Sequence, residues 1–137
     1  ELLDDKGTEV WSIASTDSVY DGLALMAEKN IGALLVMDRG RLVGILTERD
    51  YTRDVPLQGR TARDTQAGEI MTSRPVCVGP DQTLEECMAL MTDKRVRHLP
   101  VIEGDRVIGL ISIGDAVKAT ISEQRFIIQQ LEQYISG

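Results

Sequence analysis

The chain has 137 residues, of which 42% are hydrophobic, 27% are charged and 4% are aromatic, and its formal net charge at pH 7 is −7. This length and composition predict one soluble globular domain that builds its own core. The acidic balance and the few aromatic residues argue against a nucleic-acid-binding protein and against binding to an anionic membrane. Because no apolar run is long enough to span a bilayer and no secretory leader is visible, we expect a cytoplasmic protein.

The cysteines support the same location. Cys77 and Cys87 lie ten residues apart without a CxxC pairing, and the chain has a single histidine. Such a set does not make a zinc site, so we expect no bound metal. We interpret both cysteines as reduced, structural thiols, with a redox role as the alternative.

After a lead-in at residues 1–9, residues 10–55 predict a β-α-β-β-α unit. It starts with the extended stretch "VWSI" and contains the β-rich runs "ALLVM" and "LVGILT" around "DRGR", which is a hairpin signal. The strands are almost continuously apolar, which indicates that helices cover at least one face of their sheet. The first helix has a serine N-cap and apolar residues at helical spacing, namely Ser18, Val19, Leu23 and Met26.

Residues 56–74, "PLQGRTARDTQAGEIMTSR", predict a linker with a short helical turn, because Pro, Gly and Thr are frequent there. The densest basic region of the chain, with Arg60, Arg63 and Arg74, falls in this segment. We interpret it as a solvated connector, and a binding patch is the alternative.

Residues 75–120 predict a second unit of the same kind, because the chain contains an internal repeat. Residues 16–53 align with residues 81–118 at a constant offset of 65, and nine of the 38 pairs are identical. The second unit begins with "PVCV", has Thr83 as the helix N-cap, and forms its hairpin around "EGDR". Neither unit is large enough to form a stable core alone, so we expect them to pack sheet to sheet about an approximate twofold axis.

The last helix is expected to run from Ile113 to about Tyr134 and thus to form a C-terminal helical extension at residues 121–137. Its apolar residues recur close to a heptad seam, which needs a partner surface. We expect a homodimer to supply that surface, and folding back onto the same domain is the alternative. The seam consists of Val117, Ile121, Ile128, Leu131 and Ile135.

The repeat carries one polar motif twice, as "GILTERD" at residues 44–50 and as "GLISIGD" at residues 109–115. A hydroxyl residue followed three positions later by an acid at a helix start resembles a capping box. In that structure the hydroxyl accepts from the third helical N–H and the acid accepts from the N–H of the cap residue. This interpretation gives the motif a purely structural role.

The same atoms also suit a ligand. A helix N-terminus with unpaired amides binds phosphate, the hydroxyl adds a donor, and the aspartate can accept two hydrogen bonds from a cis-diol. The glycine allows a ligand to lie against the strand, and a cation three residues after each aspartate adds positive charge or simply faces solvent. The residues concerned are Gly44, Thr47, Asp50 and Arg53 in the first copy and Gly109, Ser112, Asp115 and Lys118 in the second. The two interpretations are compatible.

The paired motifs, the runs "NIGALLVMD" and "VRHLPVIEG" and the repeated unit resemble a cystathionine β-synthase (CBS) domain pair, also called a Bateman module, over residues 8–122. The whole chain is similar to the small free-standing bacterial proteins of this type. The resemblance implies an α/β (α+β) fold of two tandem β-α-β-β-α motifs packed sheet to sheet with pseudo-twofold symmetry. It also implies an adenosine-containing ligand, which is AMP, ADP, ATP, NAD or S-adenosylmethionine, in two clefts between the motifs.

The resemblance further implies which residues form the clefts. Thr47 and Asp50 belong to one cleft, and Ser112 and Asp115 belong to the other. The remaining residues that the resemblance places at the nucleotide are Ile13, Ala14, Ala33, Cys77, Val78, Arg97, His98 and Pro100.

Among these residues, Arg97 and His98 are candidate phosphate contacts, although a hydrogen-bonded structural role explains His98 equally well. Gly114 stands in the second copy where the first has Arg49, and His98 stands where the first has Ala33. We therefore expect unequal occupancy of the two clefts, in favour of the one with more cations.

An enzyme is not expected, because the chain has no G-x-S-x-G elbow, no Walker loop and no H-E-x-x-H motif, and we assign no catalytic residue. A minimal nucleotide hydrolase that uses Asp50 or Asp115 with Mg²⁺ is a minor alternative. The sequence favours a regulatory sensor whose ligand shifts the arrangement of the repeats and is read by a protein partner. The other alternative is a structural dimerisation domain with degenerate clefts.

Overall fold

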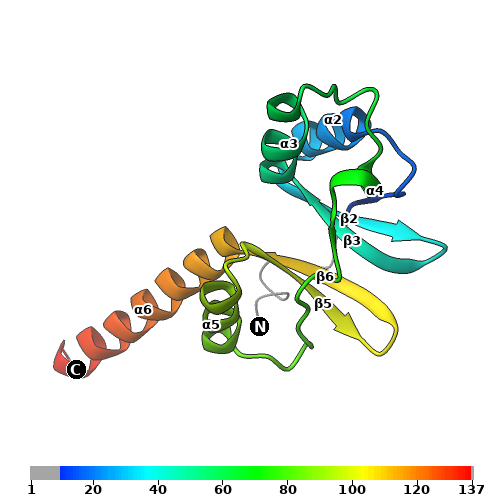
Figure 1. Ribbon diagram of the computed structural model, residues 1–137. Coiled ribbons are helices and arrows are strands. Elements are labelled where there is room, and N and C mark those ends of the chain that lie inside the picture. Colours follow the sequence, from blue (N-terminus) through cyan, green and yellow to red (C-terminus); the bar gives the residue numbers. More distant parts are fainter. Residues whose placement is uncertain (1–9, 137) are drawn as a thin grey trace.

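The computed structural model describes residues 10–136, so the predicted lead-in at residues 1–9 lies outside the described part of the chain. Two units follow one another along the chain in the predicted order, except that the first strand predicted for the second unit is reduced to an isolated bridge at Val78 (Figure 1). The first comprises β1 (Ser12–Ile13), α2 (Val19–Lys29), β2 (Ala33–Asp38), β3 (Arg41–Thr47) and α3 (Glu48–Asp54). The second comprises α5 (Leu84–Lys94), β5 (His98–Glu103), β6 (Arg106–Ser112) and α6 (Ile113–Ser136).

The strand register confirms the repeat. In the first unit Ile13 on β1 pairs in parallel with Val36 on β2, and in the second an isolated parallel bridge joins the equivalent residues Val78 and Val101. The hairpins β2–β3 and β5–β6 both shift register directly after that valine. The offset of 65 residues therefore holds for the strand pairing as well as for the sequence.

The two sheets face each other, as the repeat predicts. In Figure 1 the hairpins β2–β3 and β5–β6 are neighbours, while α2 and α3 lie on the outer side of one and α5 and α6 on the outer side of the other. Leu34 and Val36 belong to the core beneath the helices of the first unit, whereas Leu35, which lies between them and points to the opposite face, is also fully buried. Pro100, the equivalent of Leu35, is likewise buried outside the core of its own unit. The second sheet therefore covers the inner face of the first.

Local signals in the sequence explain the ends of the elements. Oγ of Ser18 accepts from the Asp21 amide at 3.0 Å, and Thr83 forms a capping box with Glu86, which confirms both predicted N-caps. The first hairpin turns through Arg39 and Gly40, both with positive φ, as two-residue hairpins of type I′ require.

The segment predicted as a linker, residues 56–74, packs against the first unit. It contains the helical turns η1 (Pro56–Gln58) and α4 (Ala67–Ile70), and also the strand β4 (Thr72–Ser73), which sequence analysis did not predict. β4 pairs with β3 and completes a four-stranded sheet.

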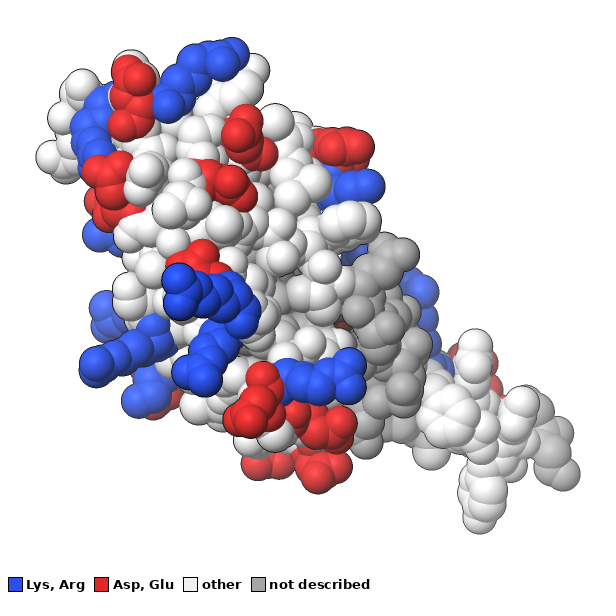
Figure 2. Space-filling model, turned by 90° about the vertical axis from the view of Figure 1, so that its right-hand side faces the viewer, with Lys and Arg blue, Asp and Glu red and all other residues white. Residues whose placement is uncertain are grey.

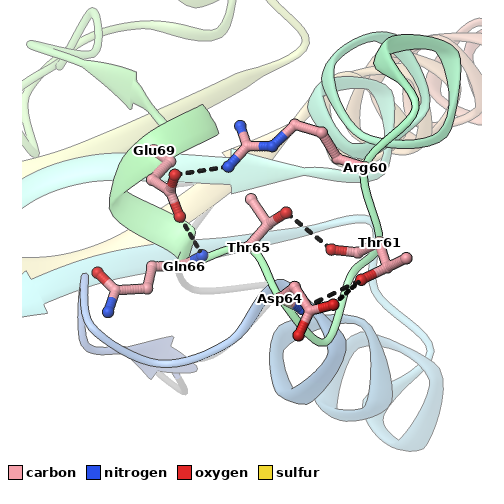
Figure 3. A network of polar contacts seen from close by, with 6 residues as sticks. All are labelled: Arg60, Thr61, Asp64, Thr65, Gln66 and Glu69. Carbon is pink, nitrogen blue, oxygen red and sulfur yellow. Dashed lines mark hydrogen bonds and ion pairs between the residues drawn. The ribbon is translucent and has the colours of Figure 1, made fainter.

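Polar contacts hold this segment in place (Figure 3). The hydroxyl of Thr65, the buried polar residue of the described chain, donates to the Thr61 carbonyl at 2.7 Å, and Arg60 forms an ion pair with Glu69. The Val19 amide donates to the Thr65 carbonyl at 2.8 Å, so that the segment is also tied to the start of α2. These bonds fix the path of a segment that is rich in turn residues.

The predicted long final helix is present as α6, which has 24 residues. Its C-terminal part projects away from both units, and in Figure 2 it extends at the lower right with few charged side chains (Figures 1 and 2). Phe126 is 62% exposed and Leu131 56% exposed, so the alternative that the extension folds back onto its own domain is wrong. None of the helices in the described part of the chain is long and apolar enough to cross a membrane.

Candidate functional site

Two clefts lie where the units meet. The first has a cavity volume of about 390 Å³ and combines the β3–α3 junction of the first unit with the α5–β5 turn of the second. The second has about 630 Å³ and combines the β6–α6 junction with the α2–β2 turn. Both volumes fall within the roughly 300–1,000 Å³ that is usual for small-molecule sites.

The linings of the two clefts are equivalent under the repeat. The β3–α3 junction contributes Ile45, Thr47, Glu48, Arg49, Asp50 and Arg53 to the first cleft, and the β6–α6 junction contributes their equivalents Leu110, Ser112, Ile113, Gly114, Asp115 and Lys118 to the second. The turns correspond as well, with Arg95, Val96, Arg97 and His98 matching Asn30, Ile31, Gly32 and Ala33. The pseudo-twofold axis therefore generates two versions of one site.

Both polar motifs form the capping boxes that their spacing suggests. In the first, the Thr47 amide donates to Oδ2 of Asp50 at 3.0 Å, and the Asp50 amide donates to Oγ1 of Thr47 at 3.0 Å. In the second, the Ser112 amide donates to Oδ2 of Asp115 at 2.8 Å, and the Asp115 amide donates to Oγ of Ser112 at 3.1 Å. The structural interpretation of the motif is thus confirmed, and it uses one carboxylate oxygen of each aspartate.

The amides at the helix starts are less available to a phosphate than the sequence suggested. The Glu48 amide donates to the Gly32 carbonyl at 3.1 Å, and the Ile113 amide donates to the Arg97 carbonyl at 2.8 Å. Together with the caps, these bonds engage the first and third amides of each helix. In addition, α3 has only seven residues, so its dipole is short. Anion recognition in the first cleft must therefore come mainly from side chains.

Cationic side chains are abundant in both clefts. The first is lined by five arginines and two carboxylates, and the second by three cations and one carboxylate, although the whole chain carries a net charge of −7. Lys and Arg side chains also gather at mid-height of the face shown in Figure 2. Positive clefts on an acidic protein attract small anions selectively. The cations are Arg49, Arg53, Arg74, Arg95 and Arg97 in the first cleft and Lys29, Arg97 and Lys118 in the second.

Two of these arginines have an unfavourable backbone conformation. Arg74 and Arg95 both have φ of 53–55°, in the left-handed region where a β-carbon costs about 1–2 kcal/mol. At the position equivalent to Arg95, Asn30 has the same φ of 55° as the C-cap of α2. Asparagine is a frequent residue at such caps and arginine is not, so arginine at this position makes the fold less stable than asparagine would.

Asp50 is half-buried in the first cleft. Burial raises the pKa of its carboxyl, although the hydrogen bonds from Thr47 act in the opposite direction. A buried carboxylate is stabilised by further donors, which hydroxyl groups of a ligand can supply. Asp50 is thus suited to bind a diol.

The clefts unite some of the predicted residues and leave others out. Thr47, Asp50, Arg97 and His98 line the first cleft, and Ala33, Arg97, His98, Ser112 and Asp115 line the second. Val78 is buried in the core of the second unit, and Pro100 is buried between the sheets. Ile13 packs against the core of the first unit, while Ala14 and Cys77 are half-buried outside both linings.

Sequence reasoning missed several lining residues. Trp11 lines the second cleft with Lys29 stacked on its ring, 4.1 Å from the centroid, and Val76, the equivalent of Trp11, lines the first. The repeat offset relates these two residues, so the sequence contained a signal that could have identified both as equivalent lining residues. Arg95 was missed because it reaches the Asp50 cleft from the opposite unit.

The interpretation of Gly44 requires a correction. A β-carbon at this position would lie 2.5 Å from Sδ of Met71 and 2.8 Å from the Thr72 carbonyl oxygen. Gly44 therefore makes room for β4 and the residue before it, and not for a ligand as the sequence suggested.

Among residues 10–136 there is no group of three or more His, Cys, Asp or Glu side chains placed to hold a metal ion. Cys77 and Cys87 are free thiols, and burial raises the pKa of both, which disfavours the reactive thiolate.

Comparison with protein families matches the CBS domain to residues 7–56 and again to residues 67–122. The chain belongs to the CBS domain family. The CBS pair is 43% identical over 136 residues to the mitochondrial CBS domain-containing protein CBSX3 of Arabidopsis thaliana, which covers 96% of this chain. The chain spans only 66% of the length of that relative.

Solved structures agree with this assignment. The crystal structure of a CBS-domain containing protein from Agrobacterium tumefaciens is 38% identical and superposes with a TM-score of 0.82, covering 87% of this chain and 95% of its own. A hexameric CBS-CP12 protein from bloom-forming cyanobacteria is 32% identical with a TM-score of 0.75, covering 80% of this CBS pair and 65% of its own chain. Pairs of CBS motifs are commonly regulatory modules that bind small molecules, and the two equivalent clefts lie where the motifs of this pair meet.

Proposed function

We propose that this CBS pair is a non-catalytic regulatory module that binds an adenosine-containing nucleotide in the clefts between its motifs. The observation that carries the proposal is the repeated arrangement of a hydroxyl, a carboxylate and several cations in two concave sites of an acidic protein. These groups match a phosphate and a ribose diol.

In the first cleft, Asp50 binds the ribose. The capping bond occupies Oδ2, and an ionised carboxylate has further lone pairs on its second oxygen for hydroxyl donors. Oγ1 of Thr47 accepts from the Asp50 amide, so its own O–H remains able to donate to a phosphate oxygen. Capping and ligand binding therefore use different atoms of the same two side chains.

The second cleft repeats these roles with Ser112 and Asp115. Its apolar wall differs, because Trp11 and Ala33 stand where the first cleft has Val76 and His98. Aliphatic residues of both linings are suited to the adenine ring, and they include Ile45, Val76 and Val96 in the first cleft and Ile31 and Leu110 in the second. In this proposal Ile13, Ala14, Cys77, Val78 and Pro100 support the walls from behind.

The charges favour polyphosphates among the candidate ligands. Arginine binds phosphate oxygens in a bidentate manner, and the first cleft offers five guanidinium groups. ATP and ADP should therefore bind more tightly than AMP. S-adenosylmethionine carries a positive sulfonium group and should bind most weakly.

The signal is a change in the arrangement of the two units. A nucleotide in either cleft contacts the helix start of one unit and the turn of the other, so it favours the arrangement in which both contacts are made. The differential affinity of the ligand sets the size of this shift, and a protein partner reads it.

We also propose that the protein is a homodimer through α6. The seam predicted from the sequence is exposed along the projecting helix, with Ile128 53% and Ile135 82% exposed. Between residues 126 and 135 the sequence has one charged residue, Glu132. A long, uncharged and apolar helix face of this kind is typical of an oligomer interface.

Thermal unfolding with AMP, ADP, ATP, NAD and S-adenosylmethionine tests the proposed ligand class. A ligand at 100 times its Kd should stabilise the protein by about 2.7 kcal/mol. Asp50→Ala and Asp115→Ala should each remove the part of the shift that comes from one cleft. Steady release of ADP or phosphate from ATP would contradict the non-catalytic role.

A structural dimerisation domain is the second candidate. The capping boxes favour it, because the motif residues cap their helices without any ligand. No stabilisation by any of the five nucleotides would support this candidate and refute the sensor.

A further inference from the structure

His98 and two equivalent residues, Gly32 and Arg97, line both clefts. Gly32 and Arg97 are related by the repeat offset, so they lie on opposite sides of the pseudo-twofold axis. Each belongs to the turn that closes the cleft of the other unit, while its carbonyl accepts the first amide of the following helix in its own unit. Both residues are therefore linked to the two sites at once.

Only one of the two carries a side chain. Gly32 offers no group to a ligand, whereas Arg97 is exposed and offers five N–H donors on one guanidinium. Arg97 is thus the Lys or Arg side chain that the two described cleft linings share.

The clefts depend on this cation to different degrees. Without Arg97, the first cleft retains four arginines, and the second retains Lys29 and Lys118. A guanidinium that binds a phosphate in a bidentate manner in one cleft cannot bind a second phosphate in the same way in the other cleft. Losing the contact with Arg97 lowers the affinity of the second cleft for an anion more than that of the first, because the second cleft has fewer cations of its own.

We propose that Arg97 couples the two clefts with negative cooperativity, so that a polyphosphate in the first cleft lowers the affinity of the second for another anionic ligand. This inference rests on the proposed function and adds its regulation: the second cleft fills only at higher ligand concentration. Linkage requires the effect to be reciprocal. We expect a factor of about five or more, which is the lower end of typical allosteric coupling.

Calorimetric titration of the full chain with ATP, and separately with inorganic tripolyphosphate, tests the coupling. Arg49→Glu blocks the first cleft for both probes, and its position is equivalent to Gly114, so the second cleft has no corresponding side chain. We expect the second cleft of Arg49→Glu to bind at least about fivefold more tightly than the weaker site of the wild type. In Arg97→Gln, adding Arg49→Glu should no longer change the affinity of the second cleft.

Arg53→Gln is the matched control, because it removes one cation that lines the first cleft alone. The coupling should persist in this variant. An equal affinity of the second cleft with and without Arg49→Glu would refute the inference, and so would coupling that survives Arg97→Gln. If tripolyphosphate shows the coupling and ATP does not bind, the adenosine part of the proposed function fails and the inference stands. If the wild type binds neither probe, both fail.

Discussion

Replacing Arg95 by asparagine should stabilise the fold and weaken nucleotide binding at the same time. Arg95 is the C-cap of α5, has a φ of 55° and is exposed. The left-handed conformation costs a residue with an ordinary β-carbon about 1–2 kcal/mol, and asparagine tolerates it better. The equivalent cap of α2 is Asn30 with the same φ. We therefore expect Arg95→Asn to raise the free energy of unfolding by about 0.5–1 kcal/mol.

The effect on binding has the opposite sign. Arg95 lines the first cleft, and a hydrogen bond to a charged group is worth about 1.5–3 kcal/mol. Because the side chain is exposed, the lower end of that range applies. This corresponds to a loss of ATP affinity of about tenfold. A purely structural arginine would show the gain in stability without the loss of affinity.

Arg39→Asn is a matched control for both effects. Arg39 has a φ of 53° in the β2–β3 turn and lies outside both cleft linings. Its replacement by asparagine removes the same charge as Arg95→Asn. Urea unfolding should show a gain for both variants, and calorimetry with ATP in an Asp115→Ala background should show a loss only for Arg95→Asn. Unchanged affinity in Arg95→Asn would refute the role of Arg95. An equal loss in Arg39→Asn would show that net charge, and not contact, determines the affinity.

Four further predictions concern the caps, the sheet and the last helix. Burial raises the pKa of Asp50 in the folded protein. The carboxyl group therefore stabilises the fold below the unfolded pKa of about 3.9, and this contribution is lost as the pH rises through the folded pKa. Asp50→Ala should therefore destabilise more at about pH 3.5 than at pH 7. Glu86→Ala should destabilise more at pH 7 than at about pH 3.5 in urea unfolding, because hydrogen bonds from Thr83 lower the pKa of Glu86. This variant should leave nucleotide binding unchanged. Gly44→Ala should cost about 1–3 kcal/mol in urea unfolding because its β-carbon meets β4, and a neutral result would contradict this contact. If the protein forms the proposed dimer, Ile128→Glu should convert it to a monomer in sedimentation analysis without loss of ATP binding, whereas a dimer that persists would place the interface elsewhere.

Most of the fold could be predicted from the sequence because its signals are local or repeated. The N-caps Ser18 and Thr83 depend on contacts over three residues, and hairpin turns depend on the two residues at their tips. The offset of 65 residues then transfers each assignment from one unit to the other. β4 escaped prediction because it is two residues long and its pairing with β3 is a tertiary contact.

The clefts were harder to predict because each is built from both units. The hydroxyl and the aspartate of each motif are adjacent in sequence, so their spacing revealed them. The cations of the opposite turn, such as Arg95, join the site only through the packing of the two sheets. The sequence also could not show that the first amides of α3 and α6 donate to the Gly32 and Arg97 carbonyls, because each of these bonds joins residues that are distant in the sequence although they belong to one unit.

The two copies of the repeat are identical at some positions and differ in charge at others. Pairs that are identical in both units include Leu34 with Leu99 and Val36 with Val101, which are buried under the helices and are fixed by packing. Some pairs that differ in charge lie in the clefts, where Arg95 matches Asn30 and Arg97 matches Gly32, and others, such as Arg39 with Gly104, lie outside both.

A symmetric core does not require such differences, because these positions are accessible to solvent and make few packing contacts. Chemically unequal clefts on one symmetric scaffold do require them, and they allow one ligand to fill the sites at two concentrations. Arg97, which has Gly32 as its equivalent and lines both clefts, is therefore the residue at which a change should alter the proposed regulation without altering the fold.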